Sequence, residues 1–198
     1  MSQRNGEGHH RYRMRQKLVA FGDDYWIENA LGQRVFFVDG KAFSLREHLG
    51  FQDMQGNELA AIQEKVMHIK DIYSIYRHGN VLATVKKALI TPLRQRFDVH
   101  VAGAQNMEVQ GNILDHEYEI HEGRKRVAEV SKKWFEVADT YGVDFVAVAD
   151  DILILAITVV IDMMVDGGRY NRRDPGFSEH VCSTNPGSLL FLRSNHYS

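Results

Sequence analysis

Short runs of alternating apolar and polar residues fill most of the chain before residue 149, and most end at glycine, asparagine or aspartate. Alternation with a period of two predicts half-buried β-strands, because successive side chains of a strand point to opposite faces. About a dozen runs, spaced roughly 8–12 residues apart, are typical of a sandwich or barrel rather than of strands alternating with helices. The predicted strands are 12–19, 23–27, 33–38, 41–43 with 44–50 after it, 57–65, 71–76, 81–87, 96–101, 107–113, 117–121, 124–132 and 137–148.

Three of the predicted hairpins share a pattern of Tyr-x-Ile, a short turn that contains glycine, and a strand that begins near valine. Tyrosine and isoleucine two positions apart lie on the same face of a strand, so each hairpin is expected to bury an aromatic–aliphatic pair. The glycine supplies the positive φ angle that a tight hairpin turn requires. The copies are Tyr25 and Ile27 with Gly32, Tyr73 and Ile75 with Gly79, and Tyr118 and Ile120 with Gly123.

One helix is expected at about residues 149–165, and it differs from the rest of the chain. Residues 152–161 contain no charge and a single hydroxyl, that of Thr158. A helix that is apolar on every side cannot lie on a wet surface, and this uncharged run is about half of the roughly 20 residues that a bilayer crossing needs. The pattern therefore predicts a mainly β fold, an antiparallel closed barrel of about twelve strands around a buried apolar C-terminal helix.

The acidic residues near this helix are expected at the two mouths of the barrel, where carboxylates reach water. Asp150 and Asp151 precede the apolar run, whereas Asp162 and Asp166 follow it. Asp150 and Asp151 suit an N-cap and first helical turn, because the N-terminal N–H groups there lack partners. The sequence Asp166-Gly167-Gly168 is expected to end the helix.

Length and composition predict a single domain. The 198 residues divide into a disordered N-terminus at 1–10, a barrel domain at 11–168 and a flexible tail at 169–198. The single cysteine, Cys182, allows no disulfide framework, and the first residues lack the apolar stretch of a secretory signal, so a cytoplasmic location is expected. The net charge of −2 provides no electrostatic argument for nucleic-acid binding.

The order of several short segments resembles the LURP-one-related family. This family belongs to the Tubby C-terminal-like superfamily, which also includes the phospholipid scramblases. The resemblance covers about residues 12–168 and implies a twelve-stranded antiparallel barrel around a C-terminal helix, as the periodicity does. The molecular function of the family is largely unassigned, so the resemblance implies a fold more than a function. The matching segments are Tyr12–Lys17, Asp23-Asp24-Tyr25, Gly32-x-x-Val35-Phe36, Ile72–Gly79 and Val137–Phe145.

The resemblance to scramblases implies a calcium site before the terminal helix, at Asp139 and Asp144. Calcium prefers six to eight oxygen ligands. However, Asp139 and Asp144 are five positions apart, so in one extended strand they point to opposite faces. A purely structural role for these carboxylates is the alternative that the spacing favours.

Basic residues define a candidate site for an anionic headgroup. Arg11, Arg13, Arg15 and Lys17 alternate along the first strand and share one face. Tubby domains bind phosphoinositide headgroups through Lys and Arg on the barrel surface, and the resemblance extends this to basic residues here. The outer faces of solvated barrel strands would produce the same alternation. The candidate residues are Arg13, Arg15, Lys86, Lys87, Arg124 and Lys125.

Catalytic motifs are missing from the sequence, so neither an enzyme nor a cofactor is expected. The chain has no GxSxG motif and no phosphate-binding glycine loop, and its ten histidines form no HExxH motif. The favoured function is a non-catalytic domain that binds anionic phospholipid or phosphoinositide headgroups as a membrane tether, with no transmembrane segment. The alternatives are a scramblase-like membrane protein whose helix enters lipid, and a domain that binds a protein partner and has no lipid affinity.

Overall fold

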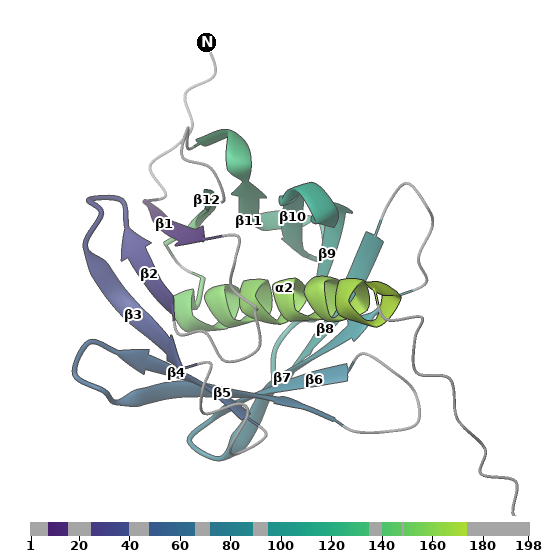
Figure 1. The fold of residues 1–198 in the computed structure, drawn as a ribbon, viewed down its shortest axis with the longest axis horizontal. Coiled ribbons are helices and arrows are strands. Elements are labelled where there is room, and N and C mark those ends of the chain that lie inside the picture. Colours follow the sequence, from purple (N-terminus) through teal and green to yellow (C-terminus); the bar gives the residue numbers. More distant parts are fainter. Residues whose placement is uncertain are drawn as a thin grey trace, which may run out of the picture.

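The protein forms a closed barrel of antiparallel strands with a helix along its interior (Figure 1). The structure, a computed structural model, describes residues 8–15, 25–39, 48–65, 72–88, 95–134, 140–147 and 149–173. The strands are β1 (His9–Arg15), β2 (Tyr25–Asn29), β3 (Arg34–Asp39), β4 (His48–Asp53), β5 (Glu58–Glu64), β6 (Ile72–Arg77), β7 (Asn80–Lys87), β8 (Gln95–Val101), β9 (Met107–Asn112), β10 (Glu117–Glu122), β11 (Lys125–Ser131) and β12 (Thr140–Val146).

Each strand pairs with its neighbours in the sequence, and β1 closes the barrel by pairing with both β2 and β12. The pairing with β12 extends from His9 opposite Val146 to Arg15 opposite Thr140. The pairing with β2 is confined to Tyr12 opposite Asn29 and Arg13 opposite Glu28. Closure leaves no unpaired sheet edge along most of the wall. The predicted mainly β, twelve-stranded closed barrel is confirmed.

The two ends of the barrel differ, because the strands alternate in direction. Five tight turns, those of β2–β3, β4–β5, β6–β7, β8–β9 and β10–β11, lie at the end where the helix α2 (Asp151–Arg173) begins. We call this the hairpin end. The opposite end, which we call the far end, holds the short 3-10 helices η1 (Ile113–Asp115) and η2 (Lys132–Trp134).

The repeated hairpin pattern is confirmed where the structure describes it. Ile27, Ile75 and Ile120 are fully buried. Tyr73 and Tyr118 are also buried beside their isoleucines, whereas the side chain of Tyr25 lies outside the described residues. The strand register shifts by one residue directly after each isoleucine, and the turn glycines Gly32, Gly79 and Gly123 have φ angles of 75°, 77° and 59°. A bulge next to a left-handed glycine is the usual way to close such a turn.

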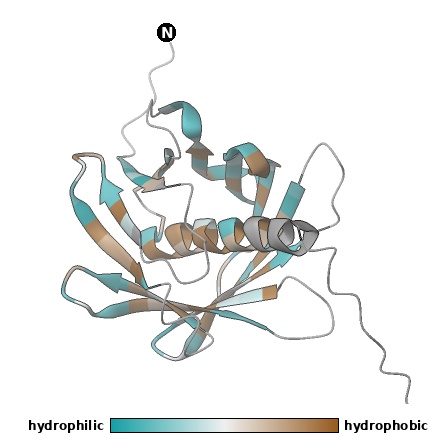
Figure 2. Ribbon diagram, viewed as in Figure 1, coloured by the Kyte–Doolittle hydropathy of each residue, from teal (hydrophilic) through white to brown (hydrophobic). Residues whose placement is uncertain are grey.

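The core lies between the barrel wall and α2, which occupies the interior (Figure 1, Figure 2). Ile154, Leu155 and Ile157 are fully buried, as are Phe51 and Phe97 on the wall. An all-round apolar helix suits this position, because every side of it meets a strand. The predicted buried helix is confirmed.

The helix extends further than the sequence pattern predicts. It begins at Asp151 and continues to Arg173, so the predicted end at Asp166-Gly167-Gly168 is wrong. Glycine costs only about 1 kcal/mol in a helix and keeps its N–H donor. Pro175 is a stronger stop, because the residue before a proline is disfavoured in the helical conformation. Residues 169–173 of the predicted tail are therefore helical, and residues 174–198 lie outside the described residues.

Most strands differ from their predicted bounds by a few residues, and the differences in β1 and β4 are the most informative. β1 begins at His9, inside the predicted disordered segment 1–10. β4 continues past Gly50 to Asp53, because Leu49 and Phe51 both point into the core and the glycine between them lies on the outer side. The predicted strand positions 16–19, 41–47 and 137–139 lie outside the described residues.

Candidate functional site

Carboxylates at the start of α2 are held by side chains of the barrel wall. Asp150 Oδ1 accepts a hydrogen bond from the backbone N–H of Leu153 at 3.1 Å, and the Arg77 guanidinium donates to both Asp150 oxygens at 2.7 and 2.8 Å. The neighbouring Asp151 accepts from the Tyr12 hydroxyl at 2.6 Å and lies 2.9 Å from His10 Nδ1. The predicted capping role of Asp150 is confirmed. These contacts fix where the helix enters the barrel.

Opposing effects set the pKa of Asp150. Burial raises the pKa of this carboxyl, but the hydrogen bonds from Arg77 and from the Leu153 N–H outweigh burial, and the net pKa lies below its ordinary value. Burial, together with the hydrogen bond to Asp151 and the charge of that carboxylate, raises the pKa of Tyr12 well above its ordinary value. A lowered carboxyl pKa stabilises the fold above the unfolded-state value of 3.8, and this contribution is lost as the pH falls through the folded-state pKa.

We expect Arg77→Met to lower the free energy of unfolding at pH 7 by about 1 kcal/mol, because the pair is partly exposed and screened by water. As the pH falls below 3.8 and through the lowered pKa of Asp150, the difference between the variant and the wild type should shrink, since the carboxylate takes up a proton and loses its charge. Urea denaturation at pH 7 and pH 3 measures this. The control Arg96→Met removes ion pairs of a more exposed arginine and should change stability by less than about 0.5 kcal/mol. An equal difference at both pH values would contradict the role of Asp150.

The six predicted basic residues do not form one patch. Arg13 lies on the outer face of β1 and donates to Glu28 at 3.1 Å, and the side chain of Arg15 lies outside the described residues. Lys86 and Lys87 belong to β7, which is six strands from β1 in either direction around the barrel. Arg124 and Lys125, both exposed, are adjacent at the turn between β10 and β11.

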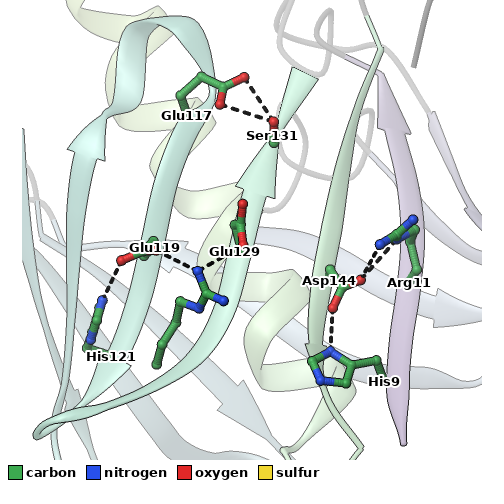
Figure 3. A network of polar contacts seen from close by, with 9 residues as sticks. His9, Arg11, Glu117, Glu119, His121, Glu129, Ser131 and Asp144 are labelled. Atoms are coloured by element: carbon green, nitrogen blue, oxygen red, sulfur yellow. Dashed lines mark hydrogen bonds and ion pairs between the residues drawn. The ribbon is translucent and has the colours of Figure 1, made fainter. Parts of the chain in front are cut away.

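The predicted calcium ligand Asp144 is engaged by cationic side chains. It points outward from β12, with Oδ1 2.6 Å from His9 Nδ1 and Oδ2 accepting from Arg11 Nε and Nη2 at 3.0 and 2.7 Å (Figure 3). A calcium ion would have to displace both of these partners. Asp139 lies outside the described residues. Among the described residues, no group of three or more His, Cys, Asp or Glu side chains is placed to hold a metal.

The outer wall over β10 and β11 contains a network of mixed charge (Figure 3). Glu119 lies 2.8 Å from Arg126 Nη1 and 2.9 Å from His121 Nε2, and the same guanidinium nitrogen lies 3.0 Å from Glu129. The hydrogen bond from Arg126, followed by that from His121, lowers the pKa of the Glu119 carboxyl. The network is therefore a paired, solvated wall and not a continuous basic surface.

An open groove of about 650 Å³ lies on the outside of the barrel over β12, with β1 on one side and β11 on the other. One wall contains His9 and Arg11, and the other contains Lys125 and Arg126. The Arg11 guanidinium also lies 4.9 Å from the centre of the Trp134 ring, which orients it by a cation–π contact. The groove thus combines three Arg and Lys side chains with the carboxylates of Asp144 and Glu129.

Sequence reasoning did not find this groove. Arg11 and Asp144 are 133 positions apart, and only the pairing of β1 with β12 brings them together. The alternation of basic residues along the first strand was a partial signal, since it placed Arg11 on the outer face.

A second polar cluster is buried inside the barrel towards the far end. The Tyr141 hydroxyl donates to Asp162 Oδ2, and His116 Nδ1 lies 3.4 Å from Asp162 Oδ1. The His116 and Tyr141 rings stack with their centres 4.4 Å apart. Burial, together with the charge of Asp162, raises the pKa of Tyr118 well above its ordinary value. Asp162 is only 3% exposed, so the prediction that it reaches water at a mouth of the barrel is wrong.

The model of the LURP-one-related family matches residues 10–162. The chain belongs to the LURP-one-related family. It is 30% identical over 161 residues to the uncharacterized protein YxjI of Bacillus subtilis (strain 168), covering 81% of this chain and 94% of that protein. A protein of Arabidopsis thaliana with a known X-ray structure has the same fold, with a TM-score of 0.58 and 19% identity over 81% of this chain and 93% of the other. These relatives give no indication of catalysis.

As for the membrane alternatives, no helix within the described part of the chain is long and apolar enough to cross a bilayer. The apolar residues of α2 instead pack inside the barrel of this LURP-one-related domain, where Val159, Val160 and Ile161 are fully buried.

Proposed function

We propose that this LURP-one-related domain is a non-catalytic membrane tether that binds anionic phospholipid headgroups. The observation that supports this most directly is the turn between β10 and β11, where Arg124 and Lys125 are exposed side by side. Lys125 also lines the groove, together with Arg11 and Arg126. The turn and the groove thus gather cations on one side of the barrel, near the hairpin end.

The strength expected from such a site is modest. Each basic residue near an anionic bilayer contributes about 1 kcal/mol, and salt screens this attraction within about 10 Å. Arg11 and Arg126 have carboxylate partners, and Arg124 and Lys125 are exposed at the turn itself, so all four cations contribute to an attraction that the neighbouring carboxylates reduce. The proposal therefore predicts weak, salt-sensitive binding that depends on headgroup charge rather than on apolar insertion of α2.

Charge reversal at this turn tests the proposal. We expect Arg124→Glu combined with Lys125→Glu to weaken binding to phosphatidylcholine vesicles containing phosphatidylserine or a phosphoinositide by about 30-fold or more, since two attractive charges become repulsive. Vesicle co-sedimentation at low salt measures the affinity, and a thermal melt of each variant confirms folding.

The matched control is Lys86→Glu combined with Lys87→Glu, which changes the charge by the same amount on β7. This control should bind about as well as the wild type at low salt. If both double variants lose the same affinity, binding follows net charge alone. If neither loses affinity, the turn between β10 and β11 is not the site.

A further inference from the structure

Three turns at the hairpin end expose a large apolar side chain. Leu31, in the β2–β3 turn, is 82% exposed, and Met54, in the β4–β5 turn, is 47% exposed. Val81, one residue after the start of β7, is 40% exposed. The three turns are successive along the wall, since β2 to β7 are neighbours in the barrel. Exposed apolar residues are ordinary when scattered, but here three lie at the same end of the barrel.

Hydrogen bonds within the first turn hold Leu31 outward. Asn29 Oδ1 accepts from the backbone N–H groups of Leu31 and Gln33, each at 3.0 Å, and the Gly32 N–H donates to the Asn29 carbonyl at 2.9 Å. The backbone beneath the side chain is thus already ordered. A side chain presented in this way loses little conformational freedom when its surroundings change from water to an apolar phase.

The second turn is organised in the same way, with the carboxylate of Asp53 hydrogen-bonded to residues of its own turn. Asp53 accepts from the backbone N–H groups of Gln55 and Asn57 at 2.9 and 2.8 Å and from the Asn57 side-chain amide at 2.8 Å. The hydrogen bond from the Asn57 side chain, the largest contribution, lowers the pKa of Asp53, so the carboxylate stays ionised within its own turn. Met54 is the side chain that this turn directs towards solvent.

The charges around these tips are mixed, and several of the carboxylates are held by hydrogen bonds within the protein. Asp150 and Asp151 at the start of α2 are occupied by Arg77, Tyr12 and His10. Exposed cations in or next to the turns include Arg34, Arg124 and Lys125, and the carboxylates that flank the turns include Asp53, Glu58 and Glu122. The two sets are equal in number, so the formal charges of these side chains cancel.

We propose that the hairpin end is the face of the domain that contacts the bilayer, with Leu31, Met54 and Val81 entering the boundary between headgroups and acyl chains. This inference rests on the proposed function and adds an orientation to it, in which α2 begins next to the membrane and ends away from it. Single apolar side chains on separate polar turns fit a fluid interface, where each tip enters independently, whereas a protein partner would require a contiguous apolar centre. Arg34, Arg124 and Lys125 then lie at the level of the phosphates.

Site-specific fluorescence tests the orientation. A nitrobenzoxadiazole label is attached to Leu31→Cys in a chain that also has Cys182→Ser, and the matched control places the label at Leu114→Cys. Leu114 is a suitable control because it is 43% exposed and apolar but lies in η1 at the far end. With phosphatidylserine-containing vesicles, the label at position 31 should brighten and shift to the blue, and the label at 114 should not.

Charged substitutions at the apolar turn residues provide a second test of the orientation. Leu31→Glu combined with Met54→Glu should weaken vesicle binding by about tenfold or more, because two partly inserted side chains become charged. Leu114→Glu should weaken it by less than about twofold, apart from its small effect on net charge.

The outcomes separate this inference from the proposed function. Binding that depends on Arg124 and Lys125, with equal label responses at 31 and 114, overturns the orientation and leaves the headgroup proposal standing. A response at 114 alone places the opposite end on the membrane and also overturns it. Absence of binding to any anionic vesicle overturns both. A response at 31 alone, together with the loss from the paired glutamates, supports the inference.

Discussion

Ile157→Asp should abolish the cooperative unfolding transition of the domain. Ile157 is fully buried in α2 inside the barrel, so the substitution places an unpaired carboxylate against an apolar wall. A buried charge without a partner costs more than about 4 kcal/mol, a large share of the roughly 5–15 kcal/mol that stabilises a domain of this size. Circular dichroism melts and limited proteolysis of the purified variant measure the loss.

Leu114→Asp is the control for this substitution, because it introduces the same charge at an exposed apolar residue. Its melting temperature should stay within a few degrees of that of the wild type. A wild-type melting transition in Ile157→Asp would mean that α2 does not form the core of the barrel.

Asp162→Ala should lower the free energy of unfolding by about 3–5 kcal/mol, the usual cost of removing one partner from a buried charged cluster. The substitution leaves the Tyr141 hydroxyl without its acceptor and His116 without the carboxylate beside it, while both remain buried. Urea denaturation at pH 7 measures the change.

Asp162→Asn is the matched variant, because it keeps the shape and one acceptor oxygen but removes the charge. It should cost about 1–2 kcal/mol, less than the alanine variant. Wild-type stability in Asp162→Ala would show that the cluster contributes nothing to the anchoring of α2 in the barrel.

Local periodicity was sufficient to predict the main elements of this fold. The alternation of apolar and polar residues located the strands, and the uncharged run from Ile152 to Ile161 identified the helix that fills the barrel. The pattern was less informative where a glycine interrupted it. Because of Gly50, the second half of β4 was not predicted as a strand. The glycines after Asp166 led to a predicted helix end there, whereas the helix continues to Arg173.

The candidate site was harder to predict, because it depends on contacts between distant segments. The groove exists only where β1 pairs with β12, which brings Arg11 and Asp144 together. Nothing in the local pattern places Lys86 on the opposite side of the barrel from Arg13, since this follows from the number of strands between them. The burial of Asp162 likewise depends on how deep α2 enters the barrel.

Exposed apolar residues and basic residues that are far apart in the sequence lie together at the hairpin end. The turns that close the hairpins also expose Leu31 and Met54, and the fifth turn provides Arg124 and Lys125. In this account, α2 is a structural core whose entry point is fixed by Asp150 and Asp151. Lipid binding is therefore expected to leave the core unchanged and to involve the turns alone.

Flotation of the wild-type protein, purified without detergent, with liposomes measures whether the domain binds anionic membranes. Liposomes of phosphatidylcholine alone are compared with liposomes that also contain phosphatidylserine or a phosphoinositide, each at low and moderate salt. We expect the protein to float with the anionic liposomes at low salt, to be released in large part by added salt, and to stay unbound with phosphatidylcholine. Absence of flotation with every anionic liposome at low salt would contradict the claim that this domain is a membrane tether.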